Sequence, residues 1–283
     1  MPAYLQPYFC TRQYARETPD HMDNTSRFGL IGYPIGGSLS PTMFKAAYGG
    51  RWAYDLIEDP SFDSAWSRFI EGYEGINVTA PYKETACAKA DILSEECRAI
   101  GATNLLVKRP DGIHAYNSDY RGVRLLLSDI GFGPGCSAVI AGFGGAGKAA
   151  AAAAASIGMT TVICNRTVSK AEGIHPLSEL NSLAADSDIV IYTLPCLVAE
   201  AEGIECRCLL EANYRTPAFA EAPGVDRYIH GREWMLLQAV TGYRLFTGED
   251  PDMAAMIRET AICGCSESPD RSPSSCPQSS AGY

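Results

Sequence analysis

The amino-acid sequence predicts an α/β protein built from two α/β domains, and three observations lead to this prediction. Strand-like and helix-like segments alternate along most of the chain, as they do in α/β sheets. A glycine-rich turn joins a β-branched strand to seven consecutive alanines, Ala149 to Ala155, and alanine is the strongest helix former. The 283 residues, of which 46% are hydrophobic and 20% charged, are enough for two hydrophobic cores.

The elements of the first domain are predicted from the segments between residues 27 and 116. Residues 27–35 (RFGLIGYPI) predict a strand that enters a Gly/Pro turn. Ser38-Leu39-Ser40-Pro41 then supplies a serine N-cap, with proline at the first helical position. The elements expected after it are a helix over 42–48, a strand over 53–57, an amphipathic helix over 62–71, a strand that ends at Lys83, a helix from about 84 to 92, and a hairpin made by 103–108 and 113–116.

The rest of the chain predicts a doubly wound, Rossmann-like domain. A helix over 122–130 leads into strands over 137–141, 160–164 and 188–192, which alternate with the glycine turn and the alanine helix. Helices over 234–246 and 252–262 are expected to return to the first domain. The predicted boundaries are an extension over 1–26, a substrate domain over 27–120 completed by 232–262, a nucleotide domain over 121–231, and a disordered Ser/Pro-rich tail over 263–283.

Composition argues against several classes of partner and site. The net charge of −10 opposes nucleic-acid binding, which needs a basic face. No apolar run approaches the roughly 20 residues that span a bilayer, and the first residues lack the basic and apolar segments of a secretory signal. The eleven cysteines are odd in number and scattered, and the four histidines lie far apart. We therefore expect reduced thiols, a cytoplasmic location, no membrane contact and no metal site.

A lysine motif marks the candidate catalytic residues. Residues 75–83 (GINVTAPYK) present Lys83 behind a short strand, and Pro81 stiffens the turn between them. α/β enzymes place their chemistry at the carboxyl ends of strands. Asp119 follows after one more strand-turn-strand of chain, so Lys83 and Asp119 are predicted to form an acid/base pair. For any one such residue taken alone, a solvated surface charge is the alternative.

The glycine turn predicts a dinucleotide site. Gly142 permits a tight turn, Gly144 lets the backbone approach a pyrophosphate, and Gly147 keeps the helix close to the sheet. The helix N-terminus, at Gly145 and Ala146, presents N–H groups to the phosphates.

The turn after the next strand selects the dinucleotide. An NAD site usually carries an acidic residue there, which binds the ribose hydroxyls. This chain has Asn165-Arg166-Thr167 instead. Arg166 is suited to pair with a 2′-phosphate and stack on the adenine, while Asn165 and Thr167 donate further hydrogen bonds. The predicted cofactor is therefore NADP(H).

Several separate motifs resemble those of the shikimate dehydrogenase family, and together they extend from about residue 28 to 262. The matching motifs are Ser38-Leu39-Ser40-Pro41, Asn77-Val78-Thr79 with Pro81 and Lys83, Gly101-Ala102-Thr103-Asn104, Asn117-Ser118-Asp119, Gly142-Phe143-Gly144-Gly145-Ala146, Asn165-Arg166-Thr167 and Leu237-Gln238-Ala239. Coincidence does not explain so many matches in order.

The resemblance implies reduction of 3-dehydroshikimate to shikimate by NADPH, a step of aromatic amino acid biosynthesis. It places Lys83 and Asp119 beside the reacting oxygen. The other roles that it implies are binding of the substrate carboxylate by Ser38, Ser40 and Tyr214, and binding of the ring hydroxyls by Thr79, Asn104 and Gln238. Gly231 completes the expected cofactor site, and hinges are expected near Asp119 and Gly231.

The chain departs from the family pattern at a few positions. Gly36-Gly37 stands where the family has a histidine, and Leu105 stands where threonine is typical. Residues 193–196 (TLPC) replace a small polar turn expected near the nicotinamide. The alternatives left open are a paralogue that acts on quinate or another hydroxylated ring acid, a non-catalytic NADP-binding regulatory protein, and a module of a larger multifunctional chain. The expected assembly is a monomer or a homodimer.

Overall fold

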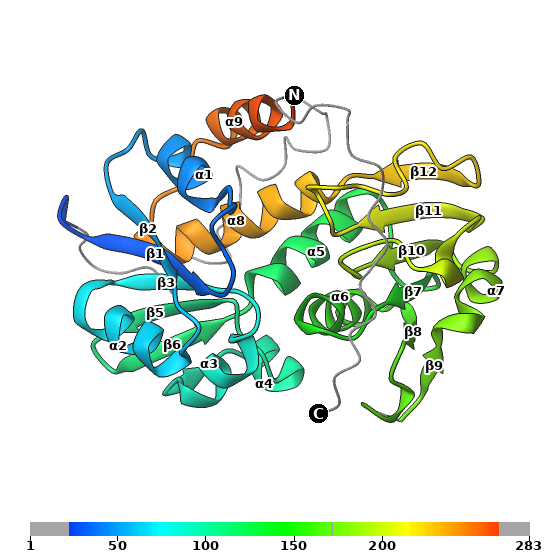
Figure 1. Ribbon diagram of the computed structural model, residues 1–283, viewed down its shortest axis with the longest axis horizontal. Coiled ribbons are helices and arrows are strands. Elements are labelled where there is room, and N and C mark those ends of the chain that lie inside the picture. The colour runs from blue at the N-terminus through cyan, green and yellow to red at the C-terminus, as the bar shows by residue number, and fades with distance from the viewer. Residues whose placement is uncertain (1–22, 171, 266–283) are drawn as a thin grey trace. The chain divides into compact units, whose positions relative to one another are not determined.

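The computed structural model describes residues 23–170 and 172–265 (Figure 1). Within that range the chain forms two compact units, which divide after Gly131 and after Trp234. Unit 1 comprises residues 23–131 and 235–263, and unit 2 comprises most of the residues between them. The first division differs from the expected one at 120/121 because the helix over 118–129 belongs to unit 1. The second differs from the expected one at 231/232 because it falls inside the helix over 231–247. Residues 1–22 of the expected extension and 266–283 of the expected tail lie outside the described residues. Residues 263–265, which were expected to be disordered, are the end of a helix instead.

Unit 1 is built on a six-stranded mixed sheet. Its strands are β1 (Arg27–Gly32), β2 (Ala53–Glu58), β3 (Gly75–Val78), β4 (Ile92–Leu93), β5 (Leu105–Arg109) and β6 (Gly112–Tyr116), in the order β2-β1-β3-β5-β6-β4. The predicted hairpin is present as β5 and β6, and β5 also runs antiparallel to β3. The remaining pairs are parallel, so β1 and β3 end at one edge of the sheet.

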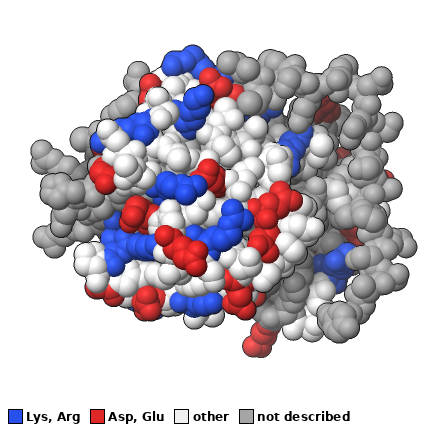
Figure 2. Space-filling view, turned by 60° about the vertical axis from the view of Figure 1, so that its left-hand side comes forward, with Lys and Arg blue, Asp and Glu red and all other residues white. Residues whose placement is uncertain are grey.

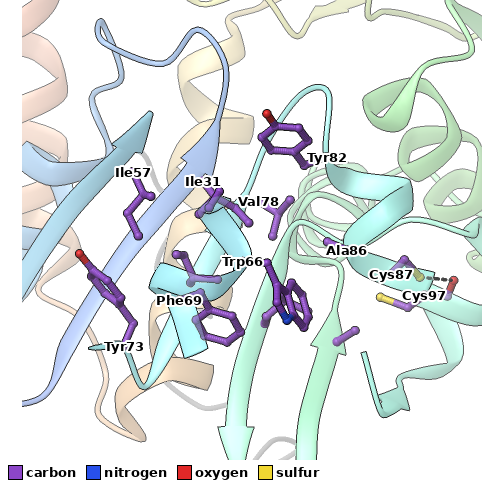
Figure 3. Packing of buried hydrophobic residues seen from close by; sticks show 14 residues of the cluster. Ile31, Ile57, Trp66, Phe69, Tyr73, Val78, Tyr82, Ala86, Cys87 and Cys97 are labelled. Carbon is purple, nitrogen blue, oxygen red and sulfur yellow. Dashed lines mark hydrogen bonds between the residues drawn. The ribbon is translucent and has the colours of Figure 1, made fainter. Parts of the chain in front are cut away.

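Helices cover both faces of this sheet. The helices of unit 1 are α1 (Ser40–Ala47), α2 (Phe62–Gly72), α3 (Lys83–Lys89), α4 (Glu95–Ile100), α5 (Ser118–Asp129), most of α8 (Gly231–Thr247) and α9 (Met253–Cys265). On one face, Trp66 and Phe69 of α2 pack with Ile31 and Val78 from the strands (Figure 3). On the other, Phe28 of β1 packs between aromatic rings of α1 and α8.

Unit 2 has the strand order of a doubly wound Rossmann sheet, which confirms the predicted fold class. Its strands are β7 (Ser137–Ala141), β8 (Thr160–Asn165), β9 (Ile174–Pro176), β10 (Ile189–Tyr192), β11 (Cys206–Glu211) and β12 (Val225–Ile229), and all adjacent pairs are parallel. The order β12-β11-β10-β7-β8-β9 is the 3-2-1-4-5-6 arrangement, and it places the topological switch point between β7 and β10. The helices of the unit are α6 (Gly145–Ser156), α7 (Leu180–Ala185) and the short 3₁₀ turns η3 (Val168–Lys170), η4 (Leu177–Glu179) and η5 (Ala199–Ala201).

The strand predicted to end at Lys83 is shorter than expected. β3 ends at Val78, and the N–H of Tyr82 donates to the Thr79 carbonyl to close a turn. Pro81 inside this turn has no N–H with which to continue the ladder. Lys83 is consequently the first residue of helix α3, and its side chain is directed by a helix end rather than by a strand.

Two other local predictions for unit 1 were wrong. The N-cap of α1 is Leu39, which makes no side-chain cap; Ser40 is already helical, and its N–H donates to the Ser38 hydroxyl (3.3 Å). The helix expected to reach residue 92 ends at Lys89. Ile92 lies in the edge strand β4, where it pairs with His114 of β6. The pairing with β6, and not the local sequence, therefore determines the conformation of this residue.

One face of the described chain mixes both signs of charge. On the face shown in Figure 2, Lys and Arg side chains lie among Asp and Glu side chains. Part of the predicted extension is fixed against unit 1, because Trp52 Nε1 donates to the Asp23 carbonyl (2.8 Å) and Arg51 donates to Asn24 (3.0 Å). Among the described residues, no helix is long and apolar enough to cross a membrane.

Candidate active site

Lys83 and Asp119 form an ion pair within unit 1. Lys83 Nζ lies 2.6 Å from Asp119 Oδ2, and the two side chains are 18% and 14% exposed. Little water reaches such a pair, so the attraction is stronger than between surface charges. The pair joins the first residue of α3 to the first turn of α5. It therefore offers an ammonium whose direction is set by a carboxylate.

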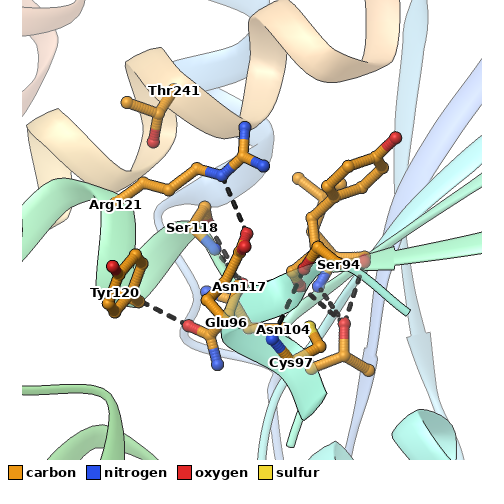
Figure 4. A network of polar contacts seen from close by, with 12 residues as sticks. Ser94, Glu96, Cys97, Asn104, Asn117, Ser118, Tyr120, Arg121 and Thr241 are labelled. Atoms are coloured by element: carbon orange, nitrogen blue, oxygen red, sulfur yellow. Dashed lines mark hydrogen bonds and ion pairs between the residues drawn. The ribbon is translucent and has the colours of Figure 1, made fainter. Parts of the chain in front are cut away.

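The start of α5 is held by buried side chains (Figure 4). Asn117 caps the helix by accepting from the Tyr120 N–H (3.0 Å), and its amide donates to the Ala102 carbonyl (3.1 Å). Two residues beyond Asp119, Arg121 pairs with Glu96 of α4 at 2.9 Å, and both side chains are only 9% exposed. These contacts fix the backbone that carries Asp119.

A buried amide network adjoins the ion pair. Asn104 Oδ1 accepts from the Ser118 N–H (2.6 Å), and Asn104 Nδ2 donates to Gln238 Oε1 (3.3 Å). The Ser118 hydroxyl lies within hydrogen-bond distance of both side-chain oxygens, 3.2 Å from Asn104 and 3.1 Å from Gln238. Two predicted substrate-binding residues are thus brought together, and Ser118 holds them.

A second chain of hydroxyls and amides reaches the same network from α1. The Ser38 hydroxyl donates to Ser40 Oγ (3.1 Å), and the Ser40 side chain is hydrogen-bonded to Tyr54. The Tyr54 hydroxyl donates to Asn77 Oδ1 (2.8 Å), whose Nδ2 donates to the Asn104 carbonyl (3.2 Å). Desolvation raises the pKa of the Tyr54 phenol, so Tyr54 remains a hydrogen-bond donor to Asn77.

The two remaining predicted substrate residues lie in different units. Thr79 follows β3 in unit 1; its N–H donates to the Ile31 carbonyl (2.9 Å), and its half-buried side chain lies in the turn before Lys83. Tyr214 belongs to unit 2, where it lies in the loop after β11. Unit 1 therefore contains Ser38, Ser40, Thr79, Asn104 and Gln238. The hydrogen bonds described above connect the two serines to Asn104 and Gln238. The substrate-binding roles of these five residues and of Tyr214 stay predictions.

The glycine loop is crowded at Gly142 and Gly147 and open at Gly144. A Cβ at Gly147 would lie 2.1 Å from the Gly142 carbonyl oxygen, so only glycine lets α6 start this close to β7. Gly142 itself has φ +103°, a conformation that favours glycine. A Cβ at Gly144 would meet nothing within 4 Å, and the first turn of α6, with Gly145 and Ala146, follows directly. Open backbone beside a helix N-terminus fits a pyrophosphate.

The turn after β8 is shaped by the first of its three predicted residues. Asn165 is buried, and its amide donates to the Thr167 carbonyl (3.0 Å). Asn165 therefore holds the turn, in addition to any contact with a cofactor. Arg166 and Thr167 are exposed, and no hydrogen bond or ion pair within the described range engages the Arg166 side chain. A cation in that position fits the 2′-phosphate of NADP(H).

Gly231 opens α8 and packs tightly against the end of β11. A Cβ there would lie 2.5 Å from the Glu211 carbonyl oxygen and 2.7 Å from that of Ala212. This close packing is enough to explain why residue 231 is glycine. A contact between Gly231 and the cofactor stays a prediction.

Sequence reasoning missed three residues that organise the site. Ser118 and Asn77 lie inside quoted motifs, and their position between predicted site residues is the signal that marks them. Tyr54 is the second residue of β2 and contacts Asn77 across 23 residues of sequence. Nothing in the local pattern identifies it.

Replacement of Ser118 tests the amide network. Ser118→Ala removes the hydroxyl that holds Asn104 and Gln238, and we expect the substrate KM to rise about 10-fold, the worth of one or two buried hydrogen bonds. Steady-state kinetics measure this change. Ser128→Ala, on the exposed side of the same helix, is the matched control. An unchanged substrate KM in Ser118→Ala would show that the amide network does not contribute to substrate binding.

Comparison with known proteins gives a consistent result. The family model "Shikimate dehydrogenase substrate binding domain" matches residues 30–106, and the model "D-isomer specific 2-hydroxyacid dehydrogenase, NAD binding domain" matches residues 134–210. A shikimate dehydrogenase (NADP(+)) from Rubrobacter xylanophilus is 31% identical over 269 residues, covering 83% of this chain and 95% of the relative.

Solved structures share the fold. A crystal structure of shikimate dehydrogenase in complex with NADP+ has a TM-score of 0.75 at 25% identity, covering 84% of this chain and 96% of that chain. Quinate dehydrogenase from Corynebacterium glutamicum, in complex with NAD, has a TM-score of 0.73 at 23% identity, covering 84% of this chain and 99% of that chain. The extent and identity of the match to the Rubrobacter relative are decisive: this chain belongs to the shikimate dehydrogenase family.

Proposed function

We propose that the protein is an NADP-dependent oxidoreductase that catalyses the reversible reduction of 3-dehydroshikimate to shikimate, a step toward aromatic amino acids. The observation that carries the proposal is the Lys83–Asp119 pair at 2.6 Å, adjoined by buried amides and hydroxyls in a member of this family. A small polyhydroxylated acid needs many such partners, and a site that pairs each hydroxyl rejects analogues that lack one.

Lys83 acts on the oxygen of the reacting carbonyl. NADPH, when bound, supplies the hydride for this reaction. The Lys83 ammonium stabilises the negative charge that develops on the oxygen and donates a proton to it. Asp119 Oδ2 accepts from Lys83 Nζ, which orients the ammonium and assists its return to the charged state. In the oxidative direction Lys83 takes the proton from the hydroxyl.

The remaining residues bind and orient the substrate and the cofactor. Ser38 and Ser40 hold the substrate carboxylate together with Tyr214, and Thr79, Asn104 and Gln238 hold ring hydroxyls. Asn104 Oδ1 is already engaged by Ser118, so Asn104 serves the substrate through the second hydrogen of Nδ2. The loop over 142–147, Asn165, Arg166 and Thr167 would hold the cofactor, with Gly231 at its edge.

A cofactor-absorbance assay tests the proposal. Purified protein with NADPH and 3-dehydroshikimate should oxidise NADPH, and the NADH and dehydroquinate arms should be much slower. The quinate arm matters because a quinate dehydrogenase has the same fold, so the fold does not choose the substrate. Activity restricted to NADH, or to dehydroquinate, would refute the proposal; absence of turnover with every pair would favour a regulatory role.

We also propose a cytoplasmic location for the reaction. The cysteines between residues 87 and 208 that the structure describes are all free, which supports a reducing compartment. For assembly we propose a monomer or a homodimer, and sedimentation equilibrium at several concentrations distinguishes the two.

Arg166 should set the preference for NADPH over NADH. Arg166→Ser removes the cation expected at the 2′-phosphate, and we expect the KM for NADPH to rise about 10-fold, the worth of a hydrogen bond to a charged group. The KM for NADH, which lacks this phosphate, should stay the same. Arg207→Ser, another exposed arginine of unit 2 that pairs with Asp188, is the control. Equal rises for NADPH and NADH would show that Arg166 does not contact the 2′-phosphate.

A further inference from the structure

Three loops meet at one edge of the unit 2 sheet. The strands β7, β10 and β11 are parallel neighbours, and Tyr192 at the end of β10 pairs in register with Glu211 at the end of β11. Their carboxyl ends therefore lie together, and ligands of doubly wound sheets bind at this edge. The loops are the glycine loop over 142–147, a second loop over 193–196, and a third loop over 212–216 that carries Tyr214.

Thr193 ties the second loop to the glycine loop. Its N–H and its hydroxyl both donate to the Ala141 carbonyl, each at 2.8 Å. A Cβ at Gly142 would lie 2.6 Å from Thr193 Oγ1, so the two loops are in close contact. The Tyr192 hydroxyl stabilises the other end of the second loop by donating to the Cys196 carbonyl (2.7 Å).

Asn213 ties the second loop to the third. Its Nδ2 donates across to the Pro195 carbonyl (2.9 Å) and within its own loop to Thr216 Oγ1 (3.0 Å) and the Thr216 carbonyl (3.1 Å). Its Oδ1 accepts from the N–H groups of Arg215 (3.1 Å) and Thr216 (3.2 Å). The oxygen of the Asn213 amide thus stabilises the turn that contains Tyr214. Its nitrogen connects that turn to Pro195 in the second loop.

The far end of the third loop is fixed by a buried carboxylate. Glu211 accepts from the Ala218 N–H (2.8 Å) and from the Tyr228 hydroxyl (2.9 Å). These hydrogen bonds fix the chain at Ala218, and the Ala212 N–H is fixed by donating to the Tyr192 carbonyl (2.8 Å). Between these two points, Asn213 makes the hydrogen bonds that hold the loop.

We propose that Asn213 is a positioning residue that transmits cofactor binding to the substrate-binding Tyr214. NADP(H) bound on the glycine loop restricts Thr193 and Pro195, and the amide of Asn213 passes this restriction to the loop of Tyr214. A loop that is already ordered loses less entropy when substrate binds, so the two ligands bind cooperatively. The part that concerns substrate rests on the proposed function.

Asn213→Asp breaks the link between the loops. The carboxylate keeps an acceptor for the N–H groups of Arg215 and Thr216, but it has no hydrogen to donate to the Pro195 carbonyl or to Thr216. Asn24→Asp makes the same change on the exposed surface of unit 1 and serves as the control. Amide hydrogen exchange of residues 212–216 is compared with and without saturating NADPH. We expect NADPH to slow exchange about 5-fold in the wild type and the control, a typical coupling, and to leave it unchanged in Asn213→Asp.

A binding experiment measures the consequence for substrate. Calorimetry gives the Kd of shikimate for the free protein and for the NADPH complex, which cannot turn over because both ligands are reduced. The wild-type ratio should be about 5 or more, and the Asn213→Asp ratio about 1. A purely structural role would weaken both values equally and preserve the ratio. NADPH protection in Asn213→Asp equal to that of the wild type would overturn the inference. An inactive wild type would instead refute the proposed function, and the exchange data still decide the role of Asn213.

Discussion

Lys83→Ala should lower kcat by about 10²–10⁴-fold, the usual contribution of a general acid or base, with a much smaller change in the substrate KM. The reason is that the ammonium acts on charge that develops in the transition state, whereas several hydroxyls and amides hold the ground state. Steady-state kinetics with NADPH and 3-dehydroshikimate measure both constants.

Lys89→Ala is the matched control. Lys89 lies on the same helix, is 42% exposed and pairs with Asp63 on the surface, so its loss should leave kcat unchanged. A double-mutant cycle with Asp119→Asn adds a sharper criterion. Because Asp119 acts through Lys83, its replacement should have little further effect once Lys83 is alanine. Additive losses, or a Lys83→Ala enzyme with normal turnover, would remove this pair from the mechanism.

Gly147→Ala should weaken NADPH binding about 100-fold and also destabilise unit 2. The added Cβ would lie 2.1 Å from the Gly142 oxygen and 3.0 Å from Thr193 Oγ1. Relief of this overlap requires backbone movement in the glycine loop, and overpacking of this kind costs roughly 1–3 kcal/mol. Fluorescence titration gives the NADPH affinity, and scanning calorimetry gives the Tm.

Gly144→Ala separates the two effects. Its Cβ has open space and its φ of −81° suits alanine, so the Tm should match the wild type. A cofactor that approaches the Gly144 backbone would still meet the new methyl group, and NADPH affinity should fall. If Gly147→Ala left the Tm unchanged, the tight packing of α6 on β7 would be disproved. If Gly144→Ala bound NADPH normally, the pyrophosphate would lie elsewhere.

Strong local signals account for the parts of the fold that the sequence predicts well. The β-branched strand, the glycines and the alanine run together define β7, the glycine loop and α6 within a few residues. The strands β11 and β12 were missed because their sequences, CRCLLE and VDRYI, carry charges. Glu211 is almost completely buried in β11, and its partners Ala218 and Tyr228 lie 7 and 17 residues further along the chain, outside the strand. A local sequence pattern does not identify hydrogen-bond partners that lie outside the strand.

The candidate site shows the same division between local and long-range information. Motif residues such as Lys83 and Asp119 were identified individually and are in contact in the structure. The contacts that orient them were not predicted, because they cross between elements. Asn117 reaches back to Ala102, and Tyr54 reaches Asn77 on a different strand. Pairing of this kind depends on the folded arrangement of β2, β3 and α5 and cannot be read from spacing.

Asn104 has a consequence for inhibitors of this enzyme. Its carbonyl accepts from Val78 and Asn77, its Oδ1 accepts from Ser118, and the same residue is proposed to bind substrate. A substitution that removed an inhibitor contact at Asn104 would leave the buried Ser118 N–H without its acceptor, at about 1–3 kcal/mol. Resistance at this position would therefore reduce folding stability and activity together, so a compound anchored on Asn104 would be difficult to escape by a single mutation.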